Sequence, residues 1–378
     1  MKPATLAPPT RLLLVGPLPI AEDVIGGTKV LFAELVAGFE RSPRFETTVV
    51  NTSRPLRGKR AALRRLLDAA AFVRVLARLW RECPRQDVVL FNVSSRGLIA
   101  SGPFVWALCR LRRTPLVVRL FGGDFAQRFD AASGLRRTLL RRTVLRCDKL
   151  LVETDGLRER FRDADRVERY PNTRDLPETP RVPREEGRGL RFLFLGQIWH
   201  EKGFLHALEA SDRLETAATV EFYGPLMPGA CEAIFDAHPR ANWHGSVEPE
   251  AVPGLLARHD VLLFPTRYTT EGMPGVVLEA MQAGLPVIAS RWPAAHEMIE
   301  DGVDGLLVEV GSTESLAQAM RVLERSEELR EKLALRARDT GDRYRHAAWQ
   351  ARLERWLDEL VGRAPELRST RTEHREVA

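Results

Sequence analysis

Two glutamates eight positions apart, Glu271 and Glu279, are the residues of this 378-residue chain best suited to chemistry. Gly272 and Gly275 keep the backbone between them free of side-chain bulk. Free N–H groups at the start of a helix attract an anion. A carboxylate on each side of such a site would repel a bare phosphate, unless both carboxylates bind hydroxyl groups. The pattern therefore favours a ligand with a diphosphate in the middle and a sugar at each end, which is a nucleotide-sugar.

A strand–loop–helix–strand unit must position these two glutamates. The short apolar runs at residues 261–264 and 287–289 predict buried strands. Between them, Pro274 suits the first position of a helix, where its missing N–H costs nothing. The helix is predicted to run to Ala283, and Gly284 suits the left-handed position that follows. Two strands joined through a helix predict a parallel crossover unit.

The residue order in this unit resembles the retaining glycosyltransferases of family 4, which have the GT-B fold. Their motif is a Glu, seven residues and a second Glu, followed by Ala-Met, a Gly and Pro-Val. The matching positions are Glu271, Glu279, Ala280, Met281, Gly284, Pro286 and Val287. The resemblance implies that Glu279 binds the ribose hydroxyls and that Glu271 binds the donor sugar beside the reacting carbon. A Glu-x7-Glu spacing alone would also suit two glutamates that merely cap or solvate a helix.

The same resemblance implies roles for other segments of the second half. The backbone of Met273, Pro274, Gly275 and Val276 is expected to face the sugar and diphosphate. Residues 243–247, ending at Val247, match the place where family members contact the base mostly through backbone atoms.

A further glycine-containing loop, at residues 196–203, resembles the family's diphosphate-binding segment. Lys202 matches the Lys of a Lys-Gly pair and is expected to be catalytic by stabilising the leaving diphosphate. Gln197 stands where Arg is frequent in the family, and it supplies a hydrogen bond without a charge. The alternative for Lys202 is a solvated surface lysine.

The first half of the chain predicts a doubly wound sheet that starts with the apolar run at residues 11–15. Gly26 and Gly27 follow this strand and precede a helix from Thr28, which is the setting of a phosphate cradle or of an ordinary tight turn. The resemblance implies that both glycines face the donor phosphates across an interdomain cleft.

The strand predicted at residues 116–121 ends in a second candidate segment, because ligands of open parallel sheets bind beyond the carboxyl ends of strands. Many family members carry a His near the donor sugar where this chain has Phe121. Asp124 is the candidate substitute. The competing interpretation of Asp124 is a helix or turn cap.

The chain carries a net charge of +6, and most of its 57 basic residues are arginines. A G+C-rich genome or a basic face for anionic lipid or phosphate would each explain this excess. The helix predicted over residues 58–82 combines an apolar stripe with many arginines. It is either a crossover helix with a solvated basic face or a peripheral contact with an anionic membrane surface.

Other function classes find little support in the sequence. The four cysteines lie far apart without zinc spacing, and they suit a reducing cytoplasm. The Asp163-x-Asp165 pair follows a charged segment rather than an apolar strand, so we predict no metal site and no cofactor besides the donor. No signal peptide or membrane span is expected, and aromatic residues are not interleaved with the arginines as in nucleic-acid binders.

These observations predict an α/β chain of the GT-B fold, with two Rossmann-like doubly wound domains and an interdomain cleft. Residues 1–172 are expected to bind the acceptor, and residues 186–344 the nucleotide-sugar. A last helix, at residues 345–362, should cross back onto the first domain, and residues 363–378 should form a disordered tail.

The predicted function is transfer of a sugar, with retention, from a nucleotide-diphosphate sugar to a hydroxyl of a glycan or lipid-linked acceptor. UDP-sugar is the expected donor because it is the commonest in the family. Such enzymes react on one face of the donor, where the leaving oxygen takes the acceptor's proton and no strong protein base is needed. The alternative is a catalytically silent GT-B protein that binds nucleotide-sugars or partners, which the departures at Gln197 and Phe121 keep open.

Overall fold

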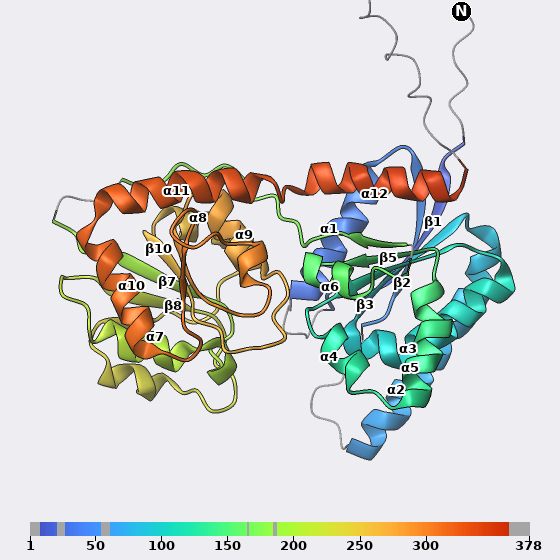
Figure 1. The fold of residues 1–378 in the computed structure, drawn as a ribbon, viewed down its shortest axis with the longest axis horizontal. Coiled ribbons are helices and arrows are strands. Elements are labelled where there is room, and N and C mark those ends of the chain that lie inside the picture. The colour runs from blue at the N-terminus through green and yellow to red at the C-terminus, as the bar shows by residue number, and fades with distance from the viewer. Residues whose placement is uncertain (1–7, 21–26, 54–60, 165, 184–186, 363–378) are drawn as a thin grey trace, which may run out of the picture.

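The computed structural model describes residues 8–20, 27–53, 61–164, 166–183 and 187–362. It contains two six-stranded parallel sheets, each covered by helices on both faces (Figure 1). The expected α/β fold class with two Rossmann-like units is therefore confirmed. Gly26, Asp165 and the tail from residue 363 lie outside the described residues.

The first sheet has the strand order β2-β1-β3-β4-β5-β6. Its strands are β1 (Thr10–Gly16), β2 (Phe45–Asn51), β3 (Val88–Ser94), β4 (Leu116–Phe121), β5 (Lys149–Val152) and β6 (Val167–Arg169). Its helices are α1 (Gly27–Arg41), α2 (Ala61–Glu82), α3 (Ser95–Arg112), α4 (Phe125–Asp130), α5 (Gly134–Arg142) and α6 (Asp155–Arg160).

The second sheet has the order β12-β11-β10-β7-β8-β9. Its strands are β7 (Arg191–Leu195), β8 (Thr219–Tyr223), β9 (Ala241–Trp243), β10 (Val261–Phe264), β11 (Val287–Ser290) and β12 (Leu306–Val308). The helices that follow β7 are α7 (Phe204–Ser211), α8 (Val252–Ala257), α9 (Gly275–Gln282), α10 (Thr313–Arg325), α11 (Glu327–Asp342) and α12 (His346–Leu360).

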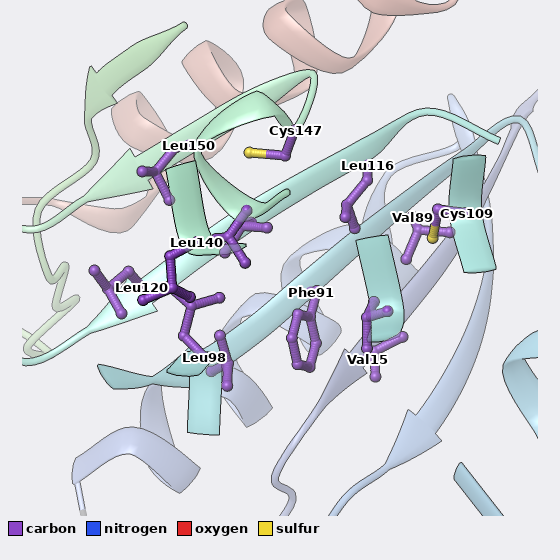
Figure 2. Close-up of a cluster of buried hydrophobic side chains, with 14 of the residues drawn as sticks. Val15, Val89, Phe91, Leu98, Cys109, Leu116, Leu120, Leu140, Cys147 and Leu150 are labelled. Carbon is purple, nitrogen blue, oxygen red and sulfur yellow. The ribbon is translucent and has the colours of Figure 1, made fainter. Parts of the chain in front are cut away.

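The central strands are apolar at successive positions because both faces of each sheet are buried. Leu13 and Val15 of β1 belong to the core beneath α2, α3 and α5, whereas Leu12 and Leu14 belong to the core beneath α1 and α12. Figure 2 shows the first of these cores, where Leu98 and Leu140 from the helices meet side chains of the strands. The two cores cover opposite faces of β1, which pairs with β2 on one side and β3 on the other.

The last helix crosses back to the first sheet. Figure 1 shows α11 and α12 running one after the other along the same side of both halves. Leu353, Trp356 and Leu357 of α12 are buried in the core that contains β1 and α1, and Trp349 packs against that core. This packing agrees with the expected return of the last helix.

Some elements differ from the predictions or go beyond them. Helix α3 begins at Ser95, where the Ser94 side chain accepts a hydrogen bond from the Gly97 N–H. Helix α5 stops at Arg142 and is followed by a separate 3-10 turn. The three-residue edge strands β6 and β9 were missed because so short a run has no readable period. Pro274 is the N-cap of α9 rather than its first residue, and Gly284 adopts the left-handed φ of 69°.

Candidate active site

A cleft of about 1080 Å³ lies between the two halves of the molecule. Its walls come from the carboxyl ends of strands in both sheets, including the segments after β4, β5, β7 and β10. The candidate residues that line it are Gly27, Asp124, Gln197, Lys202, Val247, Glu271, Met273, Pro274, Gly275, Val276 and Glu279. The fold thus brings all of the described candidates to one site, whereas Gly26 lies outside the described residues.

Lys202 and Glu271 form an ion pair inside this cleft. The Nζ atom of Lys202 lies 2.6 Å from Oε2 of Glu271, and both side chains are mostly shielded from solvent. Glu271 also accepts a hydrogen bond from the Thr266 hydroxyl at 3.4 Å. The Lys202 ammonium lies over the rings of Phe264 and Tyr268. Lys202 is therefore a positioned cleft residue and not a solvated surface lysine.

Glu279 is held by an arginine that the sequence analysis missed. Nε of Arg174 donates to Oε1 of Glu279 at 2.7 Å, and Nη1 of Arg174 donates to Oε2 of Glu34 at 3.0 Å. Burial raises the pKa of both Glu34 and Glu279, while the Arg174 charge opposes that shift. Arg174 lies in the segment between β6 and β7 and pairs with side chains of α1 and α9, so it couples the two halves at the cleft.

A second missed residue, Glu153, directly follows β5 and is 3% exposed. The Met273 N–H donates to its Oε2 at 3.4 Å, which links the first half to the loop before α9. Burial raises the pKa of Glu153 to about 7, although hydrogen bonds from the Gly122 and Met273 backbone act in the opposite direction. The signal in the sequence was an acid at the carboxyl end of a buried strand.

Asp124 occupies the N-cap position of α4, but its side chain caps no N–H group. It pairs instead with Arg128 one turn further along the helix. The cap interpretation is therefore wrong, and Asp124 and Arg128 present a partly buried ion pair to the cleft. Phe121 ends β4 with its ring 4.8 Å from the Arg119 guanidinium, so this position offers the cleft no hydrogen-bonding group from its side chain.

The segment beyond β8 adds an aromatic surface near Val247. Tyr223 lines the cleft, and its ring stacks on His244 with the centroids 4.6 Å apart. His244 is fixed in turn by Glu221, whose Oε2 lies 2.5 Å from the ring nitrogen Nε2. The Val247 wall of the cleft is thus rigidified by side chains that the sequence pattern did not single out.

The described residues contain no cluster of three or more His, Cys, Asp or Glu side chains that could hold a metal ion. No helix in the described part of the chain is both long enough and apolar enough to cross a membrane. Neither finding identifies the reaction.

Residues 189–325 match the family model described as glycosyl transferases group 1. The chain is 28% identical over 187 residues to the α-D-kanosaminyltransferase of Streptomyces kanamyceticus, a match covering 47% of this chain and 45% of that protein. It is also 28% identical over 196 residues to the sulfoquinovosyl transferase SQD2 of Arabidopsis thaliana, covering 51% and 36%. These matches span less than half the length of each relative.

Among solved structures, HepE of Anabaena in complex with UDP and glucose is similar over 93% of this chain and 100% of that one, with a TM-score of 0.68 and 16% identity. At that identity the likeness concerns the fold. Residues 189–325 of this chain are therefore similar to the glycosyl transferases group 1 family, and the chain has the GT-B fold.

Proposed function

We propose that this chain is a retaining glycosyltransferase that moves a sugar from a nucleotide-diphosphate sugar to a hydroxyl of a glycan or lipid-linked acceptor. The observation that carries the proposal is the Lys202–Glu271 pair at 2.6 Å in the same cleft as Glu279 and the start of α9. A cation, a helix start and two carboxylates in one cleft match the phosphates and hydroxyls of such a donor.

The names of the relatives support a sugar donor. The kanosaminyltransferase and the sulfoquinovosyl transferase are both named for the sugar that they transfer. The HepE structure holds UDP and glucose. These findings favour a UDP-sugar as the donor of this chain.

The proposed chemistry needs orientation and charge stabilisation more than it needs a base. The bond from the anomeric carbon to the diphosphate oxygen breaks as the acceptor hydroxyl forms a bond on the same face. The hydroxyl proton passes to the leaving diphosphate oxygen. In this proposal Lys202 turns from Glu271 toward the diphosphate and stabilises its growing charge. The first N–H groups of α9, which have no acceptor within the helix, bind the same group.

The two glutamates would then hold the polyol ends of the donor. Glu271, released from Lys202, accepts a hydrogen bond from the transferred sugar. Glu279, kept in place by Arg174, accepts from the ribose with its remaining lone pairs. The wall of the cleft that comes from the first half, which includes Asp124 and Gly27, would bind the acceptor and contact the outer face of the donor.

A donor screen followed by transfer assays tests this function. We expect UDP, among nucleoside diphosphates, to raise the melting temperature of the full chain, and UDP-sugars to be hydrolysed slowly without an acceptor. The anomeric configuration of the released or transferred sugar, read by NMR, should equal that of the donor. Inversion of that configuration would reject the retaining assignment.

The alternative is a catalytically silent GT-B protein that binds the nucleotide-sugar. It is favoured by the neutral Gln197 in the segment beside Lys202, because a neutral amide gives the leaving group no charge. Binding of a UDP-sugar without any hydrolysis, under conditions where the melting temperature rises, would establish this alternative. Hydrolysis that disappears on Lys202→Met would exclude it.

A further inference from the structure

Three neighbouring helices of the first half expose large apolar side chains. Among the described residues before position 170, every exposed large apolar side chain lies on α2, α3 or α5. They are Val73 and Trp80 on α2, Phe104 and Leu111 on α3, and Leu135 and Leu139 on α5. Leu135 is 84% exposed and Leu111 is 70% exposed, so these are not edges of the core.

The spacing of these residues aligns them along each helix. Val73 and Trp80 are seven residues apart, as are Phe104 and Leu111, while Leu135 and Leu139 are four apart. Residues four or seven apart lie on one side of a helix. Each of the three helices therefore carries its own outward apolar stripe, in addition to the inward stripe that supplies Leu79, Leu98 and Leu140 to the core.

The three helices are held side by side as one surface, which we call the α2–α3–α5 face (Figure 1). The ring of Phe72 on α2 packs edge-on against that of Phe104 on α3, with centroids 5.7 Å apart. The Arg112 guanidinium at the end of α3 lies 4.3 Å from the centre of the Trp80 ring. Trp106 of α3 donates to the Arg146 carbonyl, just beyond α5.

The charges on this face are mostly positive. Helices α3 and α5 contain no Asp or Glu, and α2 contains Asp68 and Glu82. Exposed arginines surround the apolar stripes at positions 74, 78, 81, 110, 113, 136, 141 and 142. Within the described residues, most of these arginines form no ion pair. Arg81, which pairs with Glu82, is an exception. The face is therefore both apolar and cationic.

We propose that the α2–α3–α5 face docks on the surface of an anionic lipid bilayer. Separate apolar side chains interspersed with arginines are suited to the boundary between headgroups and acyl chains, where apolar groups insert and the cations meet lipid phosphates. The negative potential of such a surface attracts each nearby arginine. A complementary protein would need acids opposite every arginine and a pocket for each of six apolar groups. This inference goes beyond the proposed function and does not depend on it.

Co-sedimentation of the full chain with vesicles tests the proposal. We expect binding to vesicles that contain roughly 30% phosphatidylglycerol, little binding to pure phosphatidylcholine, and release near 1 M salt, where the screening length is about 3 Å. Arg78→Gln with Arg136→Gln and Arg142→Gln should weaken binding by roughly fivefold per arginine. Equal binding to neutral and anionic vesicles, or no binding to either, would overturn the proposal.

The apolar stripe needs its own variant and a matched control. Leu135→Gln with Leu139→Gln removes two exposed side chains of α5 and should weaken vesicle binding by about tenfold or more. Leu335→Gln changes a leucine of α11 that is 65% exposed, outside the face, and should leave binding unchanged. Unchanged melting temperatures for the triple arginine variant, the double leucine variant and Leu335→Gln would show that folding is intact. Equal losses from the face and the control would contradict the proposed location.

A fluorophore reports the contact directly. Cys231 is exposed and the other three cysteines are buried, so Cys231→Ser provides a background with no accessible thiol. An environment-sensitive dye on Leu135→Cys should shift to the blue with anionic vesicles, whereas the same dye on Leu335→Cys should not. A blue shift of the Leu135→Cys label that appears with protein concentration alone would indicate a second copy of the chain, and would reject the bilayer as occupant. UDP binding serves as an independent readout of the proposed function.

Discussion

The Nζ atom of Lys202 lies 2.6 Å from Oε2 of Glu271, so two residues 69 positions apart in the sequence are each other's partner in the cleft. A donor that uses both must separate them or bridge them. In this pair each side chain neutralises the charge of the other and fixes its position. This relationship makes the two residues act as a unit, and its consequences are measurable.

We expect Glu271→Ala and Lys202→Met each to lower kcat by roughly 10²-fold or more, because under the proposed function each variant lacks a group that stabilises the transition state. The double variant should lose much less than the product of the two, since residues that act as a unit are non-additive. Steady-state kinetics of the four proteins form the cycle. Strictly multiplicative effects would mean that the pair has no functional coupling.

Arg174→Met should destabilise the protein, because it leaves the Glu34 and Glu279 carboxylates facing each other without their shared cation. Loss of one partner of a buried ion pair costs about 3 kcal/mol. Denaturant unfolding gives the stability change, and the donor KM reports the position of Glu279. The matched variant is Glu34→Gln, which keeps Arg174 paired with Glu279 and should change the KM little. A Glu34→Gln variant as impaired as Arg174→Met would contradict the assigned role.

Glu153 should make stability fall as pH rises. Its pKa is raised to about 7 in the folded protein, above the ordinary value of 4.5, by burial. The folded state therefore holds a proton that the unfolded state has lost between these values. The contribution of the protonated Glu153 to the free energy of unfolding is complete below the ordinary pKa and is lost as pH rises through about 7. The total is on the order of 3 kcal/mol at 1.36 kcal/mol per pKa unit.

The control for this titration is Glu153→Gln, which keeps the size and polarity of the side chain without the charge. Melting temperatures of both proteins, measured from acid to neutral pH, should show the wild type losing stability relative to the variant toward neutral pH. Parallel curves would mean that Glu153 does not titrate across this window.

The fold could be predicted from the sequence because buried parallel strands are continuous apolar runs, as in Leu12 to Val15 and Val261 to Phe264. Most candidate site residues could also be predicted, since they follow such strands in a motif of fixed spacing. Arg174 could not, because its partner Glu279 lies 105 residues away in the sequence. Only the closed arrangement of the two halves reveals that pair.

Glu153 and Asp124 show a second limit. Both residues lie beyond the carboxyl ends of strands, where ligands of parallel sheets bind. The sequence alone does not distinguish an acid that lines the cleft from one that caps a helix. The distinction is made by the partner: the backbone of Met273 for Glu153, and Arg128 for Asp124. The exposed apolar stripes of α3 and α5 could not be predicted either. Each helix also carries an apolar stripe in the core, and the sequence does not show which apolar residues face solvent.

Gly272→Ala tests how tightly the two halves must close. A Cβ atom at Gly272 would lie 2.1 Å from Oε2 of Glu153 and 3.2 Å from the Gly123 nitrogen, across the seam between the halves. We expect the variant to lose about 1–3 kcal/mol of stability, typical of overpacking, and to show a lower kcat because the cleft cannot close fully. Gly254→Ala is the control, since a Cβ there meets nothing within 4 Å.

Glu153→Ala shortens the side chain that opposes Gly272 and should relieve the clash. The double variant of Gly272→Ala with Glu153→Ala should therefore be less impaired than the sum of the two single changes. Full additivity, measured by denaturant unfolding and kcat together, would show that the two halves do not meet at this contact during turnover.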